Sequence, residues 1–144
     1  KYNRPLNIHA QWDSDTAEEV ERLAASNRSG RLILSHCGST AVPSDIRGVF
    51  ERNANVSCDL SARGVPPLQG KKNAVFDEGG LVGDWKKLIE DFPDRFVVGL
   101  DTLQNWEEYN NTLRVIRFGL LANLSPGTAE KVAYRNAEAW FGLK

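Results

Sequence analysis

The sequence predicts an α/β fold built on a parallel sheet, and two observations carry this prediction. Four apolar runs of strand length alternate with segments in which apolar residues recur at helical spacing. Strict alternation of strands and helices is typical of a parallel sheet that the helices cover. Because 144 residues suffice for one domain with a sizeable core, we expect a single domain over residues 1–144.

The first two predicted strands each end in a histidine. The segment PLNIHA (5–10) holds a short strand, and DSDTAEEVERLAAS (13–26) has the apolar period of a helix. Asp15 with Glu18 predicts a capping box at the start of that helix. The continuous apolar run RLILSH (31–36) predicts a strand that is covered on both faces.

The middle of the chain contains a helix, a third strand and a long loop. Pro43, followed by serine and aspartate, starts the helix predicted over 42–53. The run NVSCDLS (55–61) predicts the third strand. The polar, glycine-rich stretch over 62–84 predicts a loop, and loops of this length in compact domains usually have a function.

The last third alternates in the same way. A helix is predicted over 85–92, with Asp84 as its cap, and RFVVGLD (95–101) predicts the fourth strand. Apolar stripes at helical spacing predict a helix over 106–120 and a closing helix over 125–141.

The composition limits the classes of protein and of binding partner that fit this chain. Hydrophobic residues make up 41% and charged residues 26%, which is typical of a soluble globular chain. A net charge of -1 argues against nucleic-acid or membrane partners, and no apolar stretch approaches the roughly 18 residues of a membrane span. Cys37 and Cys58 lie in apolar runs and are predicted to be buried free thiols. With no methionine in the chain, we expect that Lys1 is not the natural start.

Candidate site residues collect where the predicted strands end. His9 and His36 end the first two strands, Asp59 or Ser61 ends the third, and Asp101 ends the fourth. In parallel α/β folds, functional groups lie at the carboxyl ends of strands. Histidine and aspartate are ligands that suit zinc, iron or manganese. The alternatives are that the histidines are ordinary partly buried polar residues and that Asp101 is a helix N-cap.

Three basic residues in or beside the long loop are candidates for binding an anion. Arg63 is favoured for a substrate carboxylate or phosphate, because a guanidinium binds planar anions through two parallel hydrogen bonds. Lys71 and Lys72 are better explained as solvated loop charges.

Five stretches together resemble the C-terminal half of an amidohydrolase-superfamily barrel, in the amidohydrolase-related branch of metal-dependent TIM-barrel hydrolases. They are PLNIHAQWDSDT, RLILSHCG, NVSCDLSARG, DRFVVGLDT and SPGTAEKVAYRNAEAWFGL. The resemblance implies that His9 is a metal ligand and that His36 is a ligand or polarises the substrate carbonyl. Asp101 would contact the metal site and act as general base. The implied cofactor is a divalent metal, zinc first, with manganese and iron as alternatives.

The chain also departs from this family. The strand-one His-x-His pair and any strand-four ligand are absent, and four strands are predicted where a closed barrel has eight. The fold expected is therefore strands five to eight of a TIM barrel plus a C-terminal helix. Open sheet edges predict pairing, either with an N-terminal half-barrel chain or by self-association.

The resemblance implies a metal-dependent hydrolase that cleaves a lactone, ester or amide bond, with a small acidic molecule as the expected substrate. Two alternatives remain: a non-oxidative decarboxylase of the same superfamily, and a non-catalytic half-barrel. Decarboxylases of this branch often have glycine-serine-aspartate and then proline on strand eight. The segment GLDTLQNW (99–106) differs from that pattern and favours hydrolysis.

Overall fold

The computed structural model describes residues 4–64, 74–101 and 105–143. Four parallel strands form one sheet in the order β1-β2-β3-β6. Their bounds are Leu6–Ile8 for β1, Leu32–Leu34 for β2, Val56–Asp59 for β3 and Phe96–Val97 for β6. The predicted α/β class with a parallel sheet is confirmed, and the sheet does not close into a barrel.

The helices follow the predicted order, with shorter bounds. They are α1 (Ser14–Ser26), α2 (Pro43–Arg52), α3 (Trp85–Asp91), α4 (Trp106–Val115), α5 (Pro126–Glu130) and α6 (Asn136–Phe141). Wider π-helical turns, η4 (Ile116–Leu120) and η6 (Lys131–Arg135), follow α4 and α5. Shorter 3₁₀ turns are η1 (Ser35–Gly38), η3 (Pro93–Arg95) and η5 (Leu121–Asn123). The helix predicted over 106–120 therefore ends in a π turn, and the helix predicted over 125–141 is interrupted by one.

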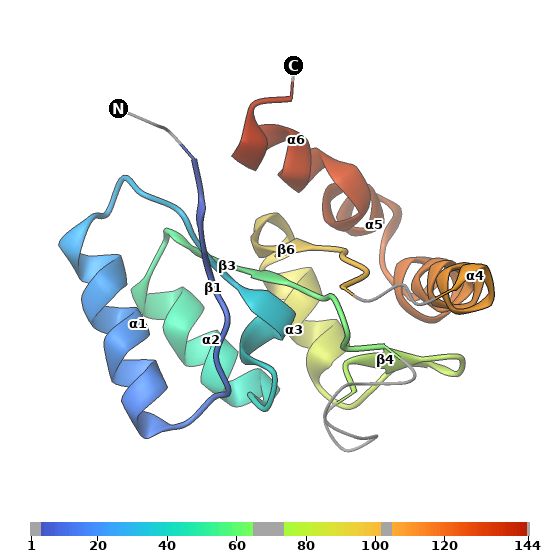
Figure 1. Cartoon of the computed structure of the whole chain (residues 1–144), viewed down its shortest axis with the longest axis horizontal. Helices are drawn as coiled ribbons and strands as arrows, with labels where there is room; N and C mark the ends of the chain where they lie inside the picture. The colour runs from blue at the N-terminus through green and yellow to red at the C-terminus, as the bar shows by residue number, and fades with distance from the viewer. Residues whose placement is uncertain (1–3, 65–73, 102–104, 144) are drawn as a thin grey trace.

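The two faces of the sheet have different partners. Leu34, Cys58 and Phe96 point to the face that joins the main core with α1, α2 and α3, which we call the outer face. On the opposite, inner face, Ile33 and Val97 form a small separate cluster with Trp140 of α6. Figure 1 shows α5 and α6 on the side of β6 away from α1 and α2. Every residue of β2 is buried, which confirms a strand covered on both faces.

The predicted loop over 62–84 is not loop throughout. A short antiparallel hairpin, β4 (Phe76–Asp77) with β5 (Gly80–Leu81), lies within it. The hairpin packs against η4 so closely that a Cβ on Gly119 would lie 1.9 Å from the backbone oxygen of Asp77. Two-residue strands are too short for apolar alternation to reveal them, so the sequence carried no signal for this hairpin.

The predicted capping box of α1 is wrong, because the helix is capped two residues earlier than Asp15. Asp13, and not Asp15, is the N-cap, and its side chain accepts a hydrogen bond of 2.7 Å from the amide of Thr16. This bond lowers the pKa of Asp13 below its ordinary value, because it favours the charged carboxylate.

We expect Asp13→Ala to lower Tm more than the matched control Asp15→Ala, because only Asp13 satisfies a free helix amide. A depressed folded-state pKa stabilises the protein above the unfolded-state pKa, and this contribution is lost as the pH falls through the folded-state pKa. The Tm difference between wild type and Asp13→Ala should therefore be constant near pH 7 and shrink below about pH 4. Thermal scans at several pH values test this, and equal effects of the two variants would contradict it.

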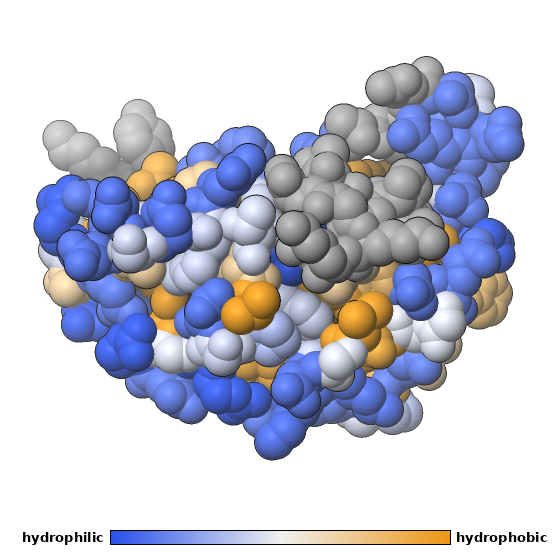
Figure 2. Space-filling model, turned by 90° about the horizontal axis from the view of Figure 1, so that it is seen from below, coloured by the Kyte–Doolittle hydropathy of each residue, from blue (hydrophilic) through white to orange (hydrophobic). Residues whose placement is uncertain are grey.

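Across the residues that the structure describes, no helix has the length and apolar character needed to cross a membrane. The face drawn in Figure 2 is mostly hydrophilic, and its apolar side chains lie in small groups between polar ones.

Candidate functional site

The chain turns sharply where β2 ends, and this turn carries His36. Four consecutive residues have positive φ angles: His36 (52°), Cys37 (49°), Gly38 (73°) and Ser39 (50°). Only glycine adopts this region without steric cost. Such strain persists where the surroundings impose it, and it occurs most often at functional sites. β2 ends at Leu34, two residues before the end predicted at residue 36, because the turn begins there.

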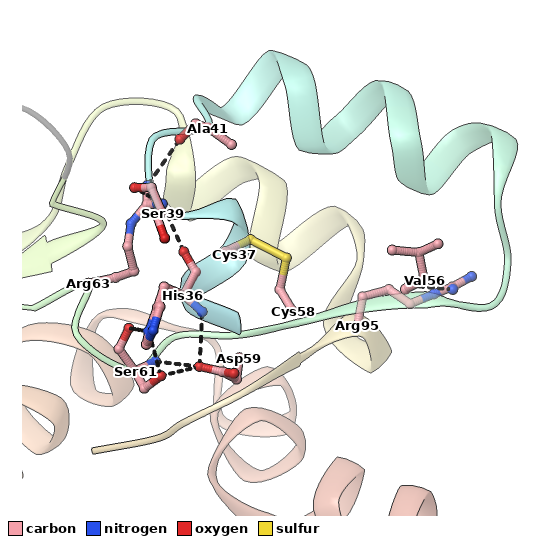
Figure 3. Close-up of a disulfide and its surroundings, with 10 residues drawn as sticks. All are labelled: His36, Cys37, Ser39, Ala41, Val56, Cys58, Asp59, Ser61, Arg63 and Arg95. Carbon is pink, nitrogen blue, oxygen red and sulfur yellow. Dashed lines mark hydrogen bonds between the residues drawn. A yellow bond between two sulfur atoms is a disulfide. The ribbon is translucent and has the colours of Figure 1, made fainter. Parts of the chain in front are cut away.

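Arg63 is the first of three groups that hold the turn. Its guanidinium donates hydrogen bonds to the backbone oxygens of His36 (2.9 Å), Ser39 (2.7 Å) and Ala41 (3.0 Å), as Figure 3 shows. The residue is only 2% exposed, and its guanidinium lies 5.0 Å from the ring centre of Trp85. Burial lowers the pKa of Arg63 to about 10. The predicted anion-binding role of Arg63 stays a prediction, whereas its contacts in this structure are with the backbone of the turn.

A disulfide is the second group that holds the turn. Cys37 and Cys58 are bonded, with their Cα atoms 4.7 Å apart, and both are fully buried. The prediction of free thiols is therefore wrong, although their burial is confirmed. The left-handed turn brings Cys37 to the outer face beside β3, where Leu34 and Cys58 are paired in register. Two cysteines separated by 21 residues gave no indication of this geometry.

The third group is the carboxylate of Asp59, which also organises the His36 ring. Its Oδ1 accepts hydrogen bonds from the amides of His36 (3.2 Å) and Ser61 (3.0 Å), and from the Ser61 hydroxyl. The Nδ1 of His36 lies 3.0 Å from the backbone oxygen of Ser61 and 2.9 Å from its Oγ. Because a carbonyl oxygen only accepts, Nδ1 carries the proton, and the lone pair is left on Nε2.

The two histidines lie together, as their positions at adjacent strand ends predicted. Their ring centres are 5.0 Å apart and the rings are nearly perpendicular, at 89°. His36 is 4% exposed, whereas His9 lies at the surface. A histidine metal ligand usually donates its second ring N–H to a carbonyl or carboxylate, which is the arrangement seen at His36.

The donor set for a metal is only partly present. Within residues 4–64, 74–101 and 105–143, no three histidine, cysteine or carboxylate side chains gather closely enough to hold an ion. His9 and His36 therefore fit part of a metal site, and a complete site would need donors from outside the described residues.

Asp101 lies at the end of the fourth strand region, beside a cavity on the inner face of the sheet. The N-cap of α4 is Asn105, which accepts a hydrogen bond of 2.9 Å from the amide of Glu108, so Asp101 is not that helix cap. Asp101 is exposed, and its φ of 74° is left-handed. The cavity has a volume of about 360 Å³, and Asp59 and Ser61 line it together with Asp101.

The sequence left open whether Asp59 or Ser61 was the candidate site residue at the end of the third strand. In the structure both contact His36 and both line the cavity. β3 ends at Asp59, and the chain then turns at Ser61 and Ala62, where Ala62 has a φ of 53°. Cys58 points to the outer face and Asp59 to the inner side, which settles the orientation that alternation alone could not. Lys71 and Lys72 lie outside the described residues.

Comparison with known proteins finds likeness in structure. No model of a protein family matches the sequence, and no curated protein matches it. An amidohydrolase from Burkholderia multivorans, solved with bound HEPES, is similar over 94% of this chain, with a TM-score of 0.55 and 15% identity. A structure of an amidohydrolase from the same organism with bound zinc is similar with a TM-score of 0.53 and 14% identity.

The match covers 53% and 52% of those two chains, so this chain spans about half of their length. At such low identity the likeness shows the fold alone. The parallel sheet and its helices match part of an amidohydrolase TIM barrel.

Proposed function

We propose that this chain is the C-terminal half of an amidohydrolase-like hydrolase that cleaves a lactone, ester or amide bond with a divalent metal. The observation that carries the proposal is the environment of His36. It is buried, it lies in strained backbone held by three separate groups, and its Nδ1 proton is fixed by Ser61. The ring centre of His36 lies 5.0 Å from that of His9.

The residues of this chain would have separate roles in the reaction. His9 and His36 would hold the metal, zinc first and manganese or iron as alternatives, with donors from the completing half. A bound divalent metal supplies the Lewis acidity that activates water at neutral pH. The carboxylate of Asp101 would accept the proton of the attacking water. His36 has a second candidate role, in which it polarises the substrate carbonyl.

The expectation of an acidic substrate depended on Arg63 as the residue that would bind the substrate's carboxylate or phosphate. Because this guanidinium already donates to three backbone oxygens and is buried, the proposal uses Arg63 to position the His36 turn.

We propose further that a second four-stranded β/α half-barrel completes the sheet. Leu6 in the edge strand β1 is 53% exposed, and Trp106 at the start of α4 is 78% exposed. On the inner face, Arg31 donates to the Ser57 hydroxyl and stacks on Trp140. Burial, and then repulsion from Arg95, lower the pKa of Arg31, and attraction from Asp94 opposes this shift.

Native mass spectrometry of the protein purified from its own cells tests completion. The expected mass exceeds that of the 144-residue chain by a second half-barrel polypeptide and one or two metal ions. A bare chain, or a metal-free dimer of it, would count against both proposals and would favour the non-catalytic alternative.

In the completed barrel, we expect Asp101→Asn to lower kcat by about 100-fold or more, because a positioned general base typically contributes 10²–10⁴-fold. Metal content, measured by mass spectrometry, should stay unchanged. Glu51→Gln, on the exposed surface of α2, is the matched control and should retain full activity. Full activity of Asp101→Asn would contradict the base role. Release of carbon dioxide with no water consumed would identify a decarboxylase instead.

A further inference from the structure

The outer edge of the sheet at β6 exposes two backbone groups that a further strand would use. Val97 faces β3, because its backbone oxygen accepts a hydrogen bond of 2.9 Å from the amide of Leu60. Since the backbone groups of successive residues in a strand point to opposite sides, the oxygen of Phe96 and the amide of Val98 point away from β3. These two groups decide whether another strand can add beside β6.

Both groups are already bonded to the C-terminal part of the chain. The backbone oxygen of Phe96 accepts a hydrogen bond of 2.8 Å from Nδ2 of Asn136, and the amide of Val98 donates one of 3.1 Å to the backbone oxygen of Val132. Figure 1 shows α5 and α6, which flank these two residues in the sequence, beside β6. We call residues 131–141, which form η6 and α6, the edge guard.

The edge guard is fixed by further contacts. Asn136 is 4% exposed, and its side chain also donates a hydrogen bond of 2.8 Å to the backbone oxygen of Pro93, just before β6. Trp140 packs on Ile33 and Val97 on the inner face of the sheet. The guard therefore covers the outer edge of β6 and the part of the inner face next to it.

The opposite edge of the sheet, at β1, has no such cover. The amide of Leu6 donates a hydrogen bond of 2.9 Å to the backbone oxygen of Arg31, so Leu6 faces β2 and Asn7 faces outward. Among residues 4–64, 74–101 and 105–143, no backbone group is bonded to the amide or backbone oxygen of Asn7. The two edges of one sheet thus differ, and only β1 is open to another chain.

We propose that the edge guard is an autoinhibitory contact, which keeps β6 closed to other chains until the parallel strand of a partner displaces it. This inference rests on the proposed function in one respect, because the partner would be the completing half-barrel. A parallel strand would offer a donor to the Phe96 oxygen and an acceptor to the Val98 amide. Displacement would therefore exchange these two hydrogen bonds without leaving either group unpaired.

The pairing that the guard prevents is pairing with a second copy. Two copies have four parallel strands each, and joining β6 of each copy to β1 of the other would close an eight-stranded sheet with twofold symmetry. An unprotected strand edge invites such pairing, and a covering helix is one of the ways in which proteins block it.

Amide hydrogen exchange in the chain alone tests whether the edge is guarded. In wild type, we expect the amide of Val98 to exchange on the order of 100-fold more slowly than the amide of Asn7. In Asn136→Ala, exchange at Val98 should accelerate on the order of fivefold to tenfold relative to Leu34 in the central strand β2, because the guard loses its side-chain bonds.

Asn123→Ala is the matched control for exchange. The Asn123 side chain also donates two hydrogen bonds to backbone oxygens, those of Phe118 and Gly119, which lie outside β6. Its loss should leave the ratio of exchange rates between Val98 and Leu34 unchanged.

Sedimentation velocity tests what the guard prevents. Wild type should remain a monomer, whereas Asn136→Ala/Trp140→Ala, which loses both bonds and packing of the guard, should form dimers as its concentration rises. Adding Asn7→Pro should restore the monomer, because proline removes the outward amide of β1 that the second copy needs. Association that persists with proline at position 7 would come from exposed apolar side chains and would overturn the proposal.

Equal exchange rates at Val98 and Asn7 in wild type would also overturn it, and so would a monomeric Asn136→Ala/Trp140→Ala variant. Neither measurement uses a metal or turnover. A guarded chain for which no second half-barrel and no metal are found would refute the proposed function and keep the guard. An active, metal-loaded barrel built from a chain whose Val98 amide is unprotected when alone would do the reverse.

Discussion

Gly119→Ala is expected to lower the free energy of unfolding by about 3 kcal/mol, at the upper end of the cost of over-packing a core. The added Cβ would lie 1.9 Å from the backbone oxygen of Asp77 and 2.9 Å from its carbonyl carbon. A backbone group cannot rotate out of the way, so the β4–β5 hairpin must move away from η4. Urea unfolding followed by circular dichroism measures the change.

Gly127→Ala is the matched control. Gly127 lies in α5 with nothing within 4 Å of the added Cβ. Alanine is a better helix former than glycine by up to about 1 kcal/mol, so this variant should be neutral or more stable. Unfolding of Gly119→Ala at the same urea concentration as wild type would show that the hairpin does not contact η4 in this way.

Replacing both cysteines, in Cys37→Ala/Cys58→Ala, should lower the free energy of unfolding by about 3 kcal/mol. The disulfide closes a loop with a sequence separation of 21, and the chain-entropy estimate for a loop of this length is about 3 kcal/mol. The cost appears in the unfolded state, which gains freedom when the link is removed. Urea unfolding of wild type and double variant measures the difference.

A reductant provides the control for the disulfide. It should lower the stability of wild type by a similar amount and leave the double variant unchanged. Two free thiols, counted in wild-type protein unfolded without reductant, would show that the bond does not form.

The sequence predicted the fold well where the signal is a repeated apolar pattern. The run over 31–36 predicted a doubly covered strand, and Leu32–Leu34 is one. Its last two residues left the strand because contacts from Arg63 and Asp59, distant in sequence, impose the left-handed turn. Cysteine and serine have no local preference for that backbone, and one glycine, Gly38, does not by itself indicate a turn of four residues.

The candidate site was predictable in part for the same reason. Equivalent positions at the ends of adjacent parallel strands placed His9 and His36 together, and their rings do lie side by side. The roles of Ser61 and the cavity were not predictable. They depend on a side chain that returns to the His36 ring and on Phe141, which α6 brings to the inner face from the other end of the chain.

Local opening of the His36 turn would be costly, because its links all lead to β3 or to the segment just after it. Releasing the turn means breaking the bonds from Asp59 and Arg63, while the covalent bond to Cys58 still restricts how far it can travel. The turn should therefore belong to the same cooperative folding unit as the central strands, and the amide of His36 should exchange with solvent as slowly as theirs. A loop position that bears a candidate metal ligand would thus be among the last parts of the molecule to fluctuate.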